Sequence, residues 1–151
     1  LSAHGGNGRA LALAAARLRR ELPELALWIP DAATVCGEAV RTIAALDGIP
    51  FTAVGLHAGE GETSELLRLC PEQVRMDRAA PDYTGDMDEG LARLVAAGTR
   101  ALAASGVVGD PRPAEADRGE RYLAAQAACY EAALAALLTA EPVIHAVSTD
   151  A

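Results

Sequence analysis

The chain has 151 residues, a length that suits one compact domain with its own hydrophobic core. Its 21 Asp and Glu residues outnumber its 13 Lys and Arg residues, and the formal charge of −8 argues against nucleic acid or an anionic membrane as a partner. Hydrophobic residues make up 51% of the sequence but aromatic residues only 3%, so small aliphatic side chains should fill the interior.

Helices and strands alternate along the chain in the predicted secondary structure. Helices are predicted where apolar side chains recur every three or four positions, and strands where short apolar runs lie between turn residues. In chain order, the predicted elements are a helix capped by Asn7 with its apolar stripe at residues 11–22, a strand at 25–29, a helix at 36–46, a strand at 51–56, a helix at 63–69, a loop at 77–87, a helix at 91–97, a strand at 99–105 and a long helix that follows Pro113, with its apolar stripe at 123–138. This alternation predicts an α/β fold with a mainly parallel sheet.

The beginning of the chain does not fit a complete sheet. Residues 1–4 are too short for a central strand, and the sequence starts without an initiator Met. We therefore expect residues 1–151 to form a single α/β domain that is the C-terminal portion of a longer domain, with its N-terminal part missing.

The cysteines and the apolar runs bear on the compartment. Cys36, Cys70 and Cys129 are widely spaced and form no CxxC pair, so neither a zinc knuckle nor a redox motif is supported. The sequence has no signal-peptide pattern, and no uninterrupted apolar run approaches the roughly 20 residues of a membrane span. These features predict a cytoplasmic protein with buried free thiols.

The first candidate site is the segment His4-Gly5-Gly6-Asn7, where a strand would meet the first helix. Ligands of open α/β sheets bind at the carboxyl ends of strands, and glycines allow a close approach to the backbone. A dinucleotide site is not supported, because the third glycine of GxGxxG and the Walker lysine are both absent. A glycine-rich turn with an incidental histidine is the alternative at this segment.

The second candidate site is the segment His57 to Ser64, with the sequence HAGEGETS, after the strand predicted at 51–56. His57 and Glu62 are of the residue types that bind metals or transfer protons, and the two glycines between them permit a tight turn. The alternative is that Thr63, Ser64 and the carboxylates cap a helix. Because both histidine-glycine motifs follow predicted strands, they should share one edge of the sheet.

Other polar residues are assigned structural roles. Asp110 precedes a proline and is typical of a turn or a helix cap, while His145 lies in an apolar C-terminal segment and is expected to be structural or disordered. The charged residues at 115–121 are expected to form a solvated helix face. The acidic residues at 82–89 do not have the spacing of an EF-hand.

The two histidine-glycine motifs together resemble those of the creatininase family. Members of that family carry an N-G-H-G-G-N-like segment, which is Ser2 to Asn7 here, and an H-A-G-x-x-E-T-S segment, which is His57 to Ser64. Residues 71–75 and 106–111 add to the similarity, which extends from residue 1 to about residue 125. The second motif is the more specific of the two.

This resemblance implies a three-layer α/β/α fold and one or two zinc, manganese or iron ions that assist hydrolysis of an amide C–N bond. By correspondence with the family motifs, His4 is predicted to bind metal and Glu62 to contact the metal or its water. His57 is predicted to be catalytic and to give a proton to the leaving nitrogen, with Glu62 as its catalytic partner. Gly59 and Asn7 are assigned to substrate binding, and a homo-oligomer, a hexamer among the forms, is expected.

The sequence also departs from the family pattern. The remaining family ligands, a Glu-x-His pair and an Asp, belong to an upstream half, so His4 and Glu62 alone fall short of the three or four ligands of a tight zinc site. Creatininase proper has Glu where Gly6 stands, and an aromatic and an acidic residue where Val54-Gly55-Leu56 stands. Both differences argue against creatinine as the substrate. The pattern is more similar to family members linked to mycofactocin peptide maturation, or to formamide deformylases.

Two classes of function follow from these observations. The first is a metal-dependent amidohydrolase that acts on a cyclic amide, formamide or peptide through a metal-activated water. The alternative is a truncated, non-catalytic homologue that serves as a binding or assembly partner. A Rossmann-like binding module is disfavoured because the GxGxxG motif is incomplete.

Overall fold

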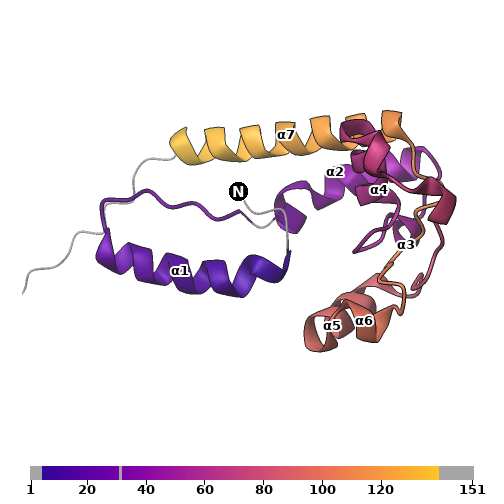
Figure 1. Cartoon of the computed structure of the whole chain (residues 1–151). Helices are drawn as coiled ribbons and strands as arrows, with labels where there is room; N and C mark the ends of the chain where they lie inside the picture. The colour runs from indigo at the N-terminus through magenta and orange to yellow at the C-terminus, as the bar shows by residue number, and fades with distance from the viewer. Residues whose placement is uncertain (1–4, 31, 140–151) are drawn as a thin grey trace, which may run out of the picture.

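The computed structural model describes residues 5–30 and 32–139, and this part of the chain is built from helices (Figure 1). The α-helices are α1 (Gly8–Glu21), α2 (Ala32–Leu46), α3 (Phe51–Val54), α4 (Glu60–Leu69), α5 (Met87–Ala97), α6 (Thr99–Leu102) and α7 (Ala116–Thr139). The short 3₁₀ helices are η1 (Gly5–Asn7), η2 (Pro71–Gln73) and η3 (Met76–Arg78).

The predicted three-layer α/β/α fold with a parallel sheet is wrong for the described residues, which contain no β-strand. Residues 25–29, predicted as the first strand, run alongside α1 without entering a ladder (Figure 1). A short apolar run has no periodicity that separates strand from other buried structure. It becomes a strand only where a neighbouring segment takes up its backbone N–H and C=O groups.

The other two predicted strands begin as helices. Residues 51–56 start with α3, which follows Pro50, and the Pro50 carbonyl accepts hydrogen bonds from Ala53 N at 2.8 Å and Val54 N at 3.2 Å. Residues 99–105 start with α6, in agreement with the high helix propensity of alanine and leucine. At the start of both segments the backbone amides are satisfied within the local helix rather than by a neighbouring strand.

Within the described residues, strand-like pairing is limited to isolated bridges at Val108. Val108 pairs with His57 in an antiparallel bridge and with Tyr83 in a parallel bridge. Leu56 N donates to Val108 O at 2.7 Å, and Val108 N donates to His57 O at 2.8 Å. The backbone of His57 is therefore tied to the loop that follows α6.

The helices predicted from periodicity are confirmed, and those predicted at 36–46, 63–69 and 91–97 begin three or four residues earlier. The helix predicted at 91–97 begins at Met87, because the Asp86 carboxylate accepts hydrogen bonds from the amides of Asp88 and Glu89, both at 2.9 Å. This is a side-chain N-cap, which satisfies amides that a helix start otherwise leaves unpaired. Gly98, with φ of +82°, ends the helix.

The core lies where α2 and α4 pack under the first half of α7 (Figure 1). A buried cluster there contains Ala44, Val54 and Tyr122, whereas a second, around α5 and the end of α6, contains Met87, Ala103 and Val108. Cys36 is buried in α2, and all three cysteines are free thiols, as predicted, although the other two are only half-buried.

The second half of α7 extends away from this core (Figure 1). Leu137 and Leu138 are exposed there, and Tyr130 makes an edge-on ring contact with Trp28 at 6.4 Å between centroids. By length and composition alone, α7 would suit a membrane-crossing helix, a property it shares with core helices of soluble proteins.

Candidate functional site

His57, in the turn between α3 and α4, and Glu62, in the first turn of α4, lie together at the surface. The His57 Nδ1 atom is 3.8 Å from Glu62 Oε2, and the two side chains are 49% and 57% exposed. A solvent-facing imidazole beside a carboxylate can accept or release a proton, and the carboxylate can orient the ring. The structure therefore brings together the two residues that were predicted to be catalytic.

The backbone at Ala58 sets this arrangement. Ala58 has φ of +51°, a left-handed conformation that costs a non-glycine residue roughly 1–2 kcal/mol. Its amide donates to Glu62 Oε2 at 2.6 Å, which compensates part of that cost. The same carboxylate oxygen thus holds the turn closed and faces the imidazole.

Glycines are required on both sides of this turn. A Cβ atom at Gly59 would lie 2.4 Å from the Val54 carbonyl oxygen, and one at Gly55 would lie 2.1 Å from the Val108 carbonyl oxygen. Gly59 is buried, so its presence is explained by close packing of the backbone. Its assignment to substrate binding stays a prediction.

The first motif is not brought to this turn by the described residues. His4 lies outside them, and Asn7 is exposed at the N-cap position of α1, where its side chain makes no capping hydrogen bond. Figure 1 shows the start of α1 near the beginning of α2, away from α4. The prediction that the two motifs share one edge of a sheet is wrong, because the described residues form no sheet. The roles assigned to His4 and Asn7 stay predictions.

A metal site is not completed by the part of the chain that the structure describes. Within residues 5–30 and 32–139, no group of three or more His, Cys, Asp or Glu side chains is placed to hold a metal ion. Glu62 has His57 beside it and no further carboxylate or thiol in such a group. The described residues alone therefore do not fit the family's metal ions.

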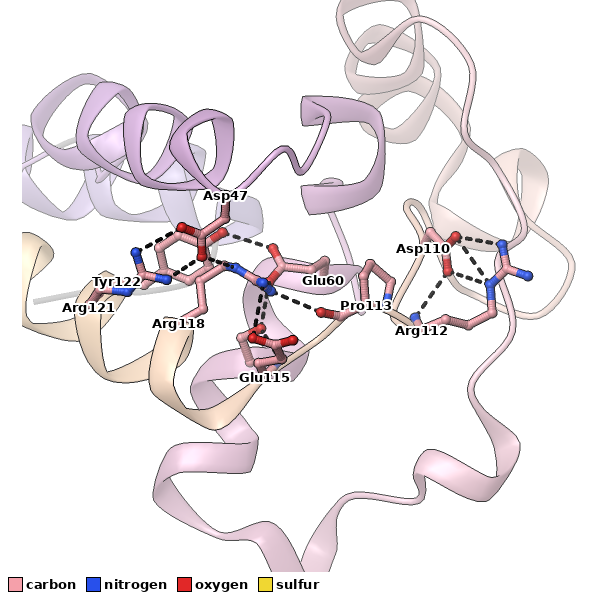
Figure 2. A network of polar contacts seen from close by, with 10 residues as sticks. Asp47, Glu60, Asp110, Arg112, Pro113, Glu115, Arg118, Arg121 and Tyr122 are labelled. Carbon is pink, nitrogen blue, oxygen red and sulfur yellow. Dashed lines mark hydrogen bonds and ion pairs between the residues drawn. The ribbon is translucent and has the colours of Figure 1, made fainter.

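Beneath the turn lies a buried polar network that the sequence did not reveal (Figure 2). Glu60 is fully buried, and its carboxylate accepts hydrogen bonds from Ser64 Oγ at 2.6 Å, Arg118 Nη1 at 2.7 Å and Tyr122 Oη at 2.9 Å. The contacts join the first turn of α4 to α7. Every polar atom of the carboxylate is thus partnered, as burial of a charge requires.

Arg118 is the centre of the network (Figure 2). It is only 4% exposed and also donates to Asp47 at 2.9 Å, to the Pro113 carbonyl at 2.9 Å and to Glu115 at 3.3 Å. The prediction that residues 115–121 form a solvated helix face is therefore wrong at Arg118. The available signal was the adjacent Gly119, a glycine inside a helix, which often marks a close packing contact.

The network favours the protonated forms of Tyr122 and Arg118. Burial and the hydrogen bond to Glu60 raise the pKa of Tyr122 above its ordinary value, so the phenol stays a donor. Burial alone would lower the pKa of Arg118, but the hydrogen bonds to Glu60 and Asp47 outweigh it and raise the pKa. Both residues therefore remain hydrogen-bond donors to the Glu60 carboxylate at neutral pH.

Asp47 should make the stability of the protein sensitive to acid. Hydrogen bonds from Arg121 and Arg118 lower the pKa of Asp47 from 3.8 to about 2. A lowered pKa stabilises the fold above the unfolded-state value and loses this effect as pH falls through the folded-state value. The free energy of unfolding, measured with urea, should fall between pH 4 and pH 2 more steeply in the wild type than in Asp47→Asn. Parallel curves for the two proteins would contradict this assignment.

Asp110 has a structural role. Its carboxylate accepts hydrogen bonds from the backbone amide of Arg112 at 3.0 Å and from the Arg112 guanidinium at 2.7 Å (Figure 2). The Arg112 guanidinium lowers the pKa of Asp110. These contacts confirm the interpretation of Asp110 as a turn residue, while His145 lies outside the described residues.

Comparison with known proteins supports the similarity of the motifs. The family model described as creatinine amidohydrolase matches residues 1–134. A protein of Mycolicibacterium smegmatis named mycofactocin precursor peptide peptidase is 35% identical over 124 residues, which are 82% of this chain and 42% of that protein. Proteins of the same name from Mycobacterium ulcerans and Mycobacterium tuberculosis H37Rv are also 35% identical, over 82% and 83% of this chain and 42% of their own length.

The chain thus spans less than half the length of these curated relatives. No solved structure matches it significantly. The family match covers the whole described region up to Leu134, including the turn that carries His57 and Glu62. The chain belongs to the creatininase family.

Proposed function

We propose that the whole protein is a metal-dependent amidohydrolase that cleaves an amide bond of a peptide. The observation that carries the proposal is the exposed His57–Glu62 pair, 3.8 Å apart, in the most specific motif of the family. A peptide substrate is supported by the relatives named mycofactocin precursor peptide peptidase. Creatinine is disfavoured, because Val54-Gly55-Leu56 lacks the aromatic and acidic residues expected before the histidine.

In this proposal His57 moves a proton to the leaving nitrogen, since its imidazole is exposed at the surface, where a substrate can reach it. Glu62 fixes the ring through Nδ1 and, by its negative charge, stabilises the protonated imidazole. His57 thus supplies the proton, and Glu62, five residues further along the chain, orients the imidazole ring.

We further propose that a divalent metal, zinc, manganese or iron, binds with His4 and Glu62 among its ligands. When bound, such an ion lowers the pKa of a water molecule and polarises the carbonyl. The described residues do not complete its site, so no step is assigned to it here. We also propose that the protein forms a homo-oligomer and is cytoplasmic.

The test is hydrolysis of a mycofactocin-type precursor peptide by the full-length protein. His57→Ala should lower kcat by roughly 10²- to 10⁴-fold, the usual contribution of a general acid–base group. Glu62→Gln should also lower kcat, whereas Glu72→Gln, which removes an exposed carboxylate from η2, should not. Full activity in His57→Ala would overturn the assignment.

A second arm of the same assay addresses the metal. Dialysis against a chelator should abolish hydrolysis, and zinc, manganese or iron should restore it. Activity that persists in metal-free protein would overturn the metal proposal while leaving the role of His57 intact.

A further inference from the structure

The segment Gly59 to Glu62 carries one buried and one exposed carboxylate two residues apart. Glu60 is 0% exposed, whereas the side chain of Glu62 is 57% exposed. A buried ion pair is weak evidence for stability, because the desolvation of two charges offsets their attraction. The burial of Glu60 is better explained by what it fixes in space.

Both neighbours of Glu60 are glycines, which pack closely against Val54 but have no side chain that could reach another helix. Gly59 and Gly61 flank Glu60, and glycine leaves the chain conformationally free. The N-cap position of α4 is Gly59, which has no side chain to cap the helix. The packing of Gly59 and Gly61 against Val54 joins α4 to α3. A restraint that joins the first turn of α4 to α7 comes from a side chain instead.

The Glu60 side chain supplies that restraint. It binds Ser64 one turn further along α4 and binds Arg118 and Tyr122 on α7. Ser64 Oγ in turn accepts from the Glu115 amide at 3.0 Å. The first turn of α4 is therefore clamped both to its own second turn and to the beginning of α7.

The clamped turn carries Glu62, and Glu62 holds the left-handed Ala58 through its amide at 2.6 Å. A backbone conformation of this kind persists only when its surroundings restrain it. We propose that Glu60 is a positioning residue, whose buried carboxylate fixes the first turn of α4 so that Glu62 stays on the Ala58 amide and beside His57. The catalytic consequence of this rests on the proposed function, whereas the structural consequence does not.

The first test observes the turn without measuring activity. In protein isotopically labelled at its alanine nitrogens, the NMR signal of the Ala58 amide proton should lie downfield because it donates to a carboxylate. Ala58→Gly identifies the signal by removing it, and Glu62→Gln gives its position when the carboxylate is lost. We expect Glu60→Gln to shift the Ala58 signal upfield toward that position, and Tyr122→Phe to shift it less in the same direction.

Arg68→Gln is the matched control. Arg68 pairs with Glu120 and so also joins α4 to α7, but through an exposed contact beyond the first turn of α4. Its loss should leave the Ala58 signal in place. An unchanged Ala58 signal in folded Glu60→Gln would overturn the proposal. If Glu60→Gln does not fold, Tyr122→Phe, which removes one hydrogen bond, decides in the same way.

The second test uses the peptide hydrolysis assay. Glu60→Gln should lower kcat roughly 10- to 100-fold, as displacement of a catalytic group does, while KM stays near the wild-type value. Arg68→Gln should change neither constant. A Glu60→Gln enzyme with wild-type kcat would overturn the proposal. If His57→Ala is fully active, the proposed function fails, but the Ala58 signal still decides whether Glu60 positions the turn.

Discussion

Replacing Arg118 with methionine should lower the free energy of unfolding by about 3–5 kcal/mol, the usual cost of removing one partner of a buried ion pair. The reason is that Glu60, which is fully buried, would lose the cation opposite it and have no other charge to compensate it. The Pro113 carbonyl would lose a donor as well. Methionine fills much of the volume of the arginine stem, so the loss should reflect the charge rather than a cavity.

Urea unfolding of the variant beside two controls measures this effect. Arg121→Met removes an arginine that is 47% exposed and pairs with the same Asp47, and exposed pairs contribute only about 0–1 kcal/mol. The double variant Glu60→Met with Arg118→Met removes both buried charges and should be more stable than Arg118→Met alone. The interpretation fails if Arg118→Met loses no more stability than Arg121→Met.

Gly119→Ala should also destabilise the protein strongly, although alanine is the better helix former. A Cβ atom at Gly119 would lie 2.0 Å from the Ser64 carbonyl oxygen and 2.9 Å from Glu65 N, so it would have to push α4 away from α7. Overpacking of this kind costs about 1–3 kcal/mol or more, against a gain of about 1 kcal/mol in helix propensity. Because both obstructing groups are backbone, no side-chain rotation can relieve the overlap.

The matched control is Gly37→Ala in α2, where a Cβ atom would meet nothing within 4 Å. That substitution should raise stability by up to about 1 kcal/mol, since only the propensity term acts there. In thermal or urea unfolding, the two glycine substitutions should thus change the free energy of unfolding in opposite directions. A stabilised Gly119→Ala would show that the close contact between the two helices is absent in solution.

The helices were predictable because their signals are local. Repeated apolar side chains indicated α1, α2, α5 and α7, and the errors lie at the helix ends, as at α5, where the capping role of Asp86 was not recognised. The strands were not predictable in the same way, because a strand depends on a partner that no local pattern specifies. Residues 25–29 have the composition of a buried strand, yet no ladder includes them.

In the candidate site, too, the local contact was predictable from the sequence and the long-range contact was not. His57 and Glu62 are five positions apart, and the glycines between them indicate a turn, so their proximity could be read from the sequence. The contact of Glu60 with Arg118 joins residues 58 positions apart, and only the packing of α4 on α7 brings them together. A charged residue in a charged run looks solvated until the helix face that it occupies is known.

Gly55, Gly59 and Gly109 bring three backbone segments into direct contact, and a Cβ atom at Gly109 would lie 2.9 Å from the Cα atoms of both other glycines. A joint made of bare backbone has no rotamers with which to absorb a displacement. The loop at residues 105–111 and the turn that carries His57 should therefore move as one rigid unit. We expect a displacement of that loop to move the backbone of His57 with it.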